Sequence, residues 1–185
     1  PITQNIETVI QNHLYKPVMA EHLVTNRLYH PEAPDLINWD AVEKASSNLT
    51  IAKKIWLTKF VSGFSGIAGK MKDRNAWESD RCPLCGLLRE NTEHVIYCTD
   101  SRAYHQYVTS LEALSDWMET SNTNPEIQTV IISALSQLHH TCDPNISQLI
   151  HSSFVREAAK AQAKIGWKNV LKGHVAIGLE KAQQQ

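Results

Sequence analysis

The stretch Arg81-Cys82-Pro83-Leu84-Cys85-Gly86, followed by His94-Val95-Ile96-Tyr97-Cys98, decides how the middle of this chain folds. Its spacing is C-x2-C-x8-H-x3-C. A Cys-x-x-Cys pair followed by Gly makes a tight knuckle in which two thiolates converge, because Gly tolerates the backbone angles required. The histidine and the last cysteine are four residues apart, so they share one face of a helix. The pattern predicts a closed, structural Zn²⁺ site with the ligands Cys82, Cys85, His94 and Cys98.

Other interpretations of these residues stay open. The pair of cysteines could be a redox motif or unrelated buried thiols, and an iron–sulfur cluster is disfavoured because His is an uncommon cluster ligand. A catalytic zinc would keep an open coordination position, which four protein ligands do not leave. His105 is an alternative fourth ligand. His139-His140 with Cys142 is a second possible metal cluster without an obvious fourth partner, which we interpret as a surface loop.

The composition describes an ordinary folded protein. The chain has 185 residues, of which 42% are hydrophobic and 20% are charged, so a packed core is expected. Its four cysteines are too few for a disulfide framework, and their clustering favours metal binding in a reducing compartment, the nucleus or cytoplasm. No apolar run approaches the roughly 18 residues of a membrane span, so we expect no membrane partner. The chain lacks an initial Met, and we expect it to be a piece of a longer protein.

Apolar residues recur with helical periodicity along most of the sequence, and strand signals are sparse. We therefore predict an all-α fold, an irregular helical bundle with one zinc-knuckle loop and at most a small hairpin around residues 82–88. Pro17 is expected to end or redirect the first helix, and Pro31 and Pro34 to mark a loop. The predicted helices cover residues 2–14, 38–45, 50–61, 107–118, 125–138, 145–163 and a terminal segment after Gly173.

Three segments of one compact domain are expected. Residues 1–50 form an N-terminal helical segment, residues 51–120 a basic helix with the zinc-knuckle core, and residues 121–185 a C-terminal helical segment. In the basic helix, the predicted buried side is made of Ile51, Ile55, Trp56 and Phe60.

The net charge of −1 conceals a strong segregation of charge. Residues 51–74 carry six basic side chains against one acid, and residues 151–185 carry six against two. Residues 91–150 carry seven acids against one arginine, so the basic and acidic segments could pair within the fold. The other interpretation is that the basic segment beside the cysteines faces a polyanion. The candidate nucleic-acid-binding residues are Lys53, Lys54, Lys59, Lys70, Lys72 and Arg74.

Aromatic residues lie near these cations. Trp56, Phe60 and Trp77 are the candidates for base stacking, and core packing is the alternative role for each. The sequence carries no phosphate-binding loop, dinucleotide fingerprint, nucleophile elbow, metalloprotease motif or polymerase aspartate pair, so we expect no catalytic activity.

The cysteine segment resembles the zinc-binding region that follows the polymerase domain in reverse-transcriptase-like proteins of non-LTR retroelements. That region reads C-P-x-C-G, then an acidic residue and Thr, then H-h-h-x-C, where h is apolar. The W-x-x-K segment at 56–59 and the I-G-W segment at 165–167 are similar to flanking segments of the same proteins. The resemblance implies zinc ligands at the same four positions and no catalytic residue.

The function that the resemblance implies is that of a non-catalytic zinc-binding accessory domain, which assists a reverse-transcriptase-like polymerase in binding RNA or DNA. The expected partners are RNA or DNA, bound weakly by the local basic patch, and a polymerase core in the parent chain. The alternative is a zinc-stapled structural or protein-interaction domain that binds no nucleic acid of its own.

Overall fold

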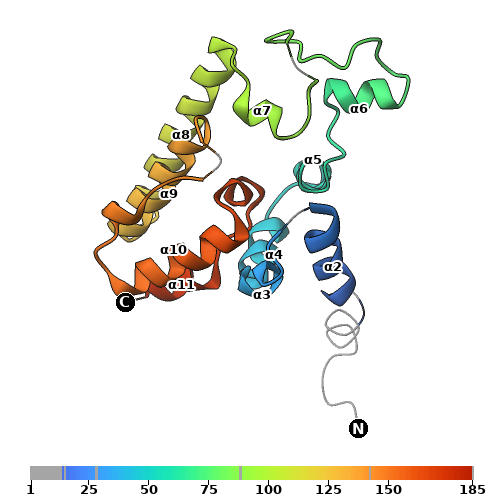
Figure 1. Ribbon diagram of the computed structural model, residues 1–185. Coiled ribbons are helices and arrows are strands. Elements are labelled where there is room, and N and C mark those ends of the chain that lie inside the picture. Colours follow the sequence, from blue (N-terminus) through green and yellow to red (C-terminus); the bar gives the residue numbers. More distant parts are fainter. Residues whose placement is uncertain (1–13, 15, 28, 88, 142, 185) are drawn as a thin grey trace.

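The computed structural model describes Leu14 and residues 16–27, 29–87, 89–141 and 143–184. The helix predicted over residues 2–14 lies outside these residues, apart from Leu14. Within the described residues the fold is all-α, which confirms the prediction, with two isolated antiparallel bridges, Ile37–Ala176 and Arg81–Arg89. The helices, shown in Figure 1, are α2 (Lys16–Arg27), α3 (Ala33–Leu36), α4 (Trp39–Ser47), α5 (Ile51–Val61), α6 (Ala68–Asp73), α7 (His94–Tyr97), α8 (Ser101–Thr120), α9 (Pro125–Leu138), the 3₁₀ turn η2 (Ser147–Leu149), α10 (Ser153–Ile165), the 3₁₀ helix η3 (Trp167–Lys172) and α11 (Ile177–Gln183).

Two prolines of the N-terminal part, Pro17 and Pro34, lie in the first turn of a helix. Pro17 is the second residue of α2, and the helix that it is expected to end or redirect lies outside the described residues. Pro31 lies in a turn, as predicted, whereas Pro34 lies in the first turn of the short helix α3, so the predicted loop ends before it. Proline is tolerated at this place because the first N–H groups of a helix have no intrahelical partner.

Side-chain caps fix the starts of three helices close to where the sequence predicts them. The side-chain oxygens of Asn38, Thr50 and Asn124 accept hydrogen bonds from the first backbone N–H groups of α4, α5 and α9, respectively. Each cap satisfies a donor that a helix end leaves without a partner.

The single helix predicted over residues 145–163 is divided. The turn η2 is followed by an extended residue, and α10 begins only at Ser153. The carboxylate of Glu126 accepts hydrogen bonds from the backbone N–H groups of His151 and Ser152, the second at 2.9 Å. Since the Ser152 hydroxyl also caps α10, this backbone starts a new helix and cannot continue an earlier one.

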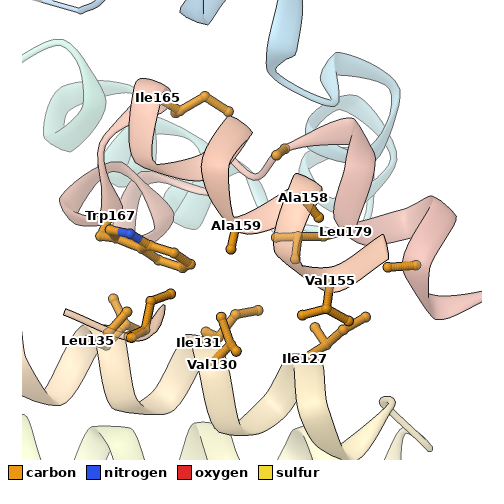
Figure 2. Close-up of a cluster of buried hydrophobic side chains, with 14 of the residues drawn as sticks. Ile127, Val130, Ile131, Leu135, Val155, Ala158, Ala159, Ile165, Trp167 and Leu179 are labelled. Atoms are coloured by element: carbon orange, nitrogen blue, oxygen red, sulfur yellow. The ribbon is translucent and has the colours of Figure 1, made fainter. Parts of the chain in front are cut away.

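The apolar core lies between α9, α10, α11 and η3. Figure 2 shows Ile127, Ile131 and Leu135 of α9 opposite Val155 of α10 and the ring of Trp167. Gly178 allows α10 and α11 to approach closely, because a Cβ there would come within 3.0 Å of the Ala158 Cα.

The short segment 174–176 runs between α4 and α10 and is held on both sides. On one side, the Asn38 N–H donates to the Val175 carbonyl at 2.8 Å. On the other, the buried side chain of Gln162 donates to the His174 carbonyl at 3.2 Å and accepts from the Ala176 N–H at 2.8 Å. The His174 ring is itself buried, with its Nδ1 2.8 Å from the Tyr29 hydroxyl.

The predicted buried side of α5 was wrong. The side chains of Ile51, Ile55 and Trp56 are exposed, at 78%, 51% and 61%, whereas Phe60 is half-buried and stacks on Trp56. Helix α5 instead turns Leu57, Phe60 and Val61 toward the rest of the molecule.

None of the helices in the described residues has the length and apolar character needed to cross a bilayer.

Candidate metal centre

The first two candidate ligands lie in a knuckle closed by its own backbone. The Gly86 N–H donates to the Cys82 carbonyl at 2.9 Å, which turns the chain so that Cys82 and Cys85 approach each other. Gly86 has φ +68°, in the left-handed region that favours glycine. An isolated antiparallel bridge between Arg81 and Arg89 joins the two arms of the loop, which agrees with the expectation of at most a small hairpin there.

The other two candidate ligands lie at the ends of α7. His94 is its first residue, and Cys98 follows its last residue in an extended conformation. The Asn91 side chain accepts a hydrogen bond from the His94 N–H at 2.7 Å and so holds the first residue of α7. The four-residue spacing of His94 and Cys98 therefore brings both side chains to the knuckle.

The four ligand atoms converge. The sulfurs of Cys82, Cys85 and Cys98 and a ring nitrogen of His94 all lie within 4.8 Å of one another. The Cys82 and Cys98 sulfurs are 3.7 Å apart, and the Cys85 sulfur is 3.3 Å from the His94 Nε2. A tetrahedron with Zn–S bonds of about 2.3 Å and a Zn–N bond of about 2.0–2.1 Å requires S–S edges of about 3.8 Å and S–N edges of about 3.6 Å. The residues thus fit one tetrahedral divalent ion.

The same crowding affects the thiols when no cation lies between them. Burial, together with hydrogen bonding to Cys82 and Cys85, raises the pKa of the Cys98 thiol to about 11. Thiolates rather than thiols bind metal, so a cation entering this site displaces protons from it. Metal affinity is therefore expected to rise with pH.

The alternative ligands do not join this group. His105 is exposed on α8 and is absent from the Cys/His cluster found among the described residues. Cys142 lies outside the described residues. His139, which the sequence suggested as part of a second cluster, packs its ring 4.7 Å from that of Tyr104, and its Nε2 lies 3.3 Å from the Cys98 carbonyl oxygen. His139 thus touches a ligand residue from outside the cluster, a contact that no local sequence pattern indicates.

Helix α6 is tied to the returning arm of the knuckle. The Glu90 carboxylate accepts from the Ala68 N–H at 2.5 Å, and the Glu90 carbonyl accepts from the Gly69 N–H at 3.2 Å. A Cβ at Gly69 would collide with that carbonyl oxygen, so this close approach requires glycine. Arg89 adds an ion pair to Asp73 at 2.6 Å. Formation of the metal site therefore also positions α6.

The six predicted nucleic-acid-binding residues fall into two groups. Lys53, Lys54 and Lys59 are exposed on α5. Lys70 and Lys72 lie on α6, and Arg74 directly follows it. Lys70 and Arg74 both lie 5.9 Å from the centre of the Phe64 ring, whereas Lys72 pairs with Asp80 at 3.6 Å.

The structure adds two cations that were not selected from the sequence. Lys168 and Lys172 of η3 line a cavity together with Phe60, close to the end of α5. The positive charge of residues 151–185 was the available signal, but it does not show which of those lysines reach α5.

No protein-family model, curated protein or solved structure matches this chain.

Proposed function

We propose that this chain is a zinc-stabilised, non-catalytic helical module that binds RNA or DNA through the basic surface of α5 and α6, as an accessory domain of a reverse-transcriptase-like polymerase. Three thiolates and one imidazole at tetrahedral distances form a closed donor set of the kind that structural Zn²⁺ prefers. These donors leave no position for a catalytic water.

The observation that carries the nucleic-acid part of the proposal is how the charges are paired. If the basic segment served only to bind the acidic segment, ion pairs would join residues 51–74 to residues 91–150. Among the described residues, two side chains of the segment 51–74 form ion pairs: Lys72 pairs with Asp80, and Asp73 pairs with Arg89. Neither partner belongs to the acidic segment. The other five candidate cations form no ion pair with an acid in the part of the chain that the structure describes.

Exposed aromatic rings accompany these cations. Trp56 and Phe60 stack with ring centres 5.4 Å apart and nearly parallel planes, at an angle of 4°. Phe64 is 56% exposed, and the cationic groups of Lys70 and Arg74 each lie 5.9 Å from the centre of its ring. Alternating cations and flat apolar faces are what single-stranded nucleic acid uses for phosphate contacts and base stacking.

The test has two measurements. Mass spectrometry of the native chain should find one Zn²⁺, which is lost in Cys85→Ser. A fluorescence titration with single-stranded RNA or DNA should show binding that weakens with salt, with a log–log slope of about −4 if all six cations contact phosphates. Replacing Lys53, Lys54 and Lys59 by Gln should reduce that slope to about −2.

A matched control replaces three exposed lysines elsewhere, Lys44, Lys160 and Lys181, by Gln. This control should leave the slope close to that of the wild type. Absence of salt-dependent binding in the wild type would refute the nucleic-acid proposal.

A protein-interaction domain is the second candidate, and the exposed apolar side chains of α5 favour it. Ile51 and Ile55 are one helical turn apart and solvent-exposed, as expected of a helix that packs against another protein. The same lysine variants discriminate between the two functions. Loss of polyanion affinity at an unchanged melting temperature supports nucleic-acid binding. A polyanion affinity that the lysine variants leave unchanged supports the protein-interaction role.

A further inference from the structure

A small cavity lies where the end of α5, the start of α7 and η3 meet. Its volume is about 200 Å³, below the roughly 300–1,000 Å³ of a pocket for a complete small ligand. Phe60 and Tyr97 contribute aromatic walls, and Lys168 and Lys172 contribute positive charge. Such a cavity suits one ring of a larger, negatively charged molecule.

This cavity continues into a second hollow toward α6. The two share Gly63, Thr92 and Glu93 in their linings, and the second extends to Phe64 and Lys70. The hollows therefore form one surface track that leads from η3, across the turn after α5, to α6. Along this track the two basic segments of the sequence, 51–74 and 151–185, come together beside the metal centre.

One acidic side chain interrupts the positive charge of the track. The Glu93 carboxylate accepts a hydrogen bond from the Lys168 ammonium group at 2.5 Å, and both side chains are exposed to solvent. Lys172 is held in place by a hydrogen bond to the Asn169 side chain at 2.9 Å and lies over the Tyr29 ring. A carboxylate bound to a lysine in this way occupies the position that a phosphate group would take.

We propose that this track binds one single-stranded polynucleotide segment, with a base in the cavity against Phe60 and phosphates at Lys168 and Lys172, and that Glu93 competes with phosphate for Lys168. The inference rests on the proposed nucleic-acid function and extends it to η3. A single strand is favoured because the cavity admits a separated ring, which a duplex cannot offer without unpairing.

The test uses the metal-loaded full chain and labelled single strands of about 16 nucleotides, oligouridylate and oligothymidylate. Glu93→Gln keeps the shape of the side chain but removes its charge, so Lys168 becomes available to phosphate. Breaking an exposed ion pair of this kind should raise the affinity about two- to fivefold. Lys168→Gln breaks the same ion pair from the other side and should lower the affinity.

The matched control is a second exposed pair, Glu157 and Lys160 on α10, whose ammonium and carboxylate groups are 2.7 Å apart. Glu157→Gln removes the same charge far from the track in sequence and should change the affinity less than Glu93→Gln. In the double variant Glu93→Gln/Lys168→Gln, the gain produced by Glu93→Gln should disappear. Metal content and circular dichroism of each variant show whether the fold is kept.

Several results would overturn the inference. Equal effects of Glu93→Gln and Glu157→Gln would show that the change in net charge, and not the track, determines the affinity. Preference for duplex over single strands would contradict the base-binding cavity. Stronger competition by polyglutamate than by either oligonucleotide would assign the track to an acidic peptide. If the α5 lysine variants weaken binding but Lys168→Gln does not, only this inference fails. If the wild type binds neither strand, the proposed function fails as well.

Discussion

Helix α9 alone buries six side chains, whereas the described residues from Ile51 to Cys98 bury no large apolar side chain. In that segment the buried residues are small or are candidate ligands: Ala68, Gly69, Cys82, His94 and Cys98. Apolar burial therefore stabilises the region from α8 to α11, but it contributes little to the segment that carries α5, α6 and α7. One chain thus uses two means of stabilisation, and the basic surface depends on the weaker apolar contacts and on the candidate ligands.

Removing the metal should have the largest effect and should divide the molecule. Structural zinc supplies about 10–16 kcal/mol of apparent binding free energy in small domains, all of it coupled to folding. In Cys85→Ser or with chelator, we expect residues 68–98 to lose hydrogen-exchange protection, while α9 and α10 keep theirs. Leu84→Ser, next to the ligand and 42% exposed, is the matched control and should retain the metal. Simultaneous loss of protection in both regions would show that the two are not separable.

Truncating a side chain of the apolar core should destabilise that core and leave the metal site intact. Leu135 is completely buried in α9, and Leu135→Ala should lower the free energy of unfolding by about 2–5 kcal/mol, through lost apolar contact and the cavity that remains. Denaturant unfolding followed by far-ultraviolet circular dichroism measures this change. The metal content should remain that of the wild type, and loss of metal would contradict the separation.

Acid should weaken the core through His174. Burial, with a smaller contribution from Lys172, lowers the pKa of His174 from 6.5 to about 4. The unfolded chain therefore binds a proton that the folded chain does not accept between these values, so this stability is present above pH 6.5 and is lost as the pH falls toward 4. From pH 8 to pH 5, the loss is about 2 kcal/mol.

Low pH also protonates the metal ligands, so His174→Gln serves as the reference. The difference in unfolding free energy between wild type and variant should shrink as the pH falls. A difference that is constant with pH would show that His174 is not held neutral by the fold.

The smallest effect is expected on the exposed side of α5. Trp56→Ala removes a ring that is 61% exposed and stacked on one neighbour, so the unfolding free energy should fall by less than about 1 kcal/mol. Trp167→Ala is the matched comparison, because Trp167 is 4% exposed and its loss should cost about 3–5 kcal/mol. Thermal unfolding of the two variants provides the measurement. Similar melting temperatures would mean that α5 is packed as tightly as the core.

The metal centre was the part of the site that could best be predicted from the sequence, because its ligands form two pairs of residues that are close together in the chain. Cys82 and Cys85 share one knuckle, and His94 and Cys98 lie one helical turn apart, so short-range geometry orients each pair. Helix starts with a capping side chain, as at Asn38 and Asn124, were accessible for the same reason.

The orientation of α5 was not accessible, because periodicity shows that a helix has apolar residues but not which neighbour it meets. The helix carries apolar residues around most of its circumference, and contact with η3 selects the side of Leu57 and Val61. Helix α2 was missed because its sequence has no continuous apolar stripe. The placement of Lys168 beside Glu93 joins residues 75 positions apart, which no local pattern encodes.

The carboxamide of Gln162 substitutes for a neighbouring β-strand, since it supplies one donor and one acceptor to the backbone of residues 174–176 where a sheet would supply a ladder. A carboxylate at this position offers only acceptors, and an aliphatic side chain offers neither a donor nor an acceptor. Replacement of Gln162 by Glu or Leu therefore leaves at least one buried backbone group of residues 174–176 without a hydrogen-bond partner. Loss of a single nitrogen by deamidation would have the same result. The turn from which α11 enters the core thus depends on the amide of one fully buried side chain.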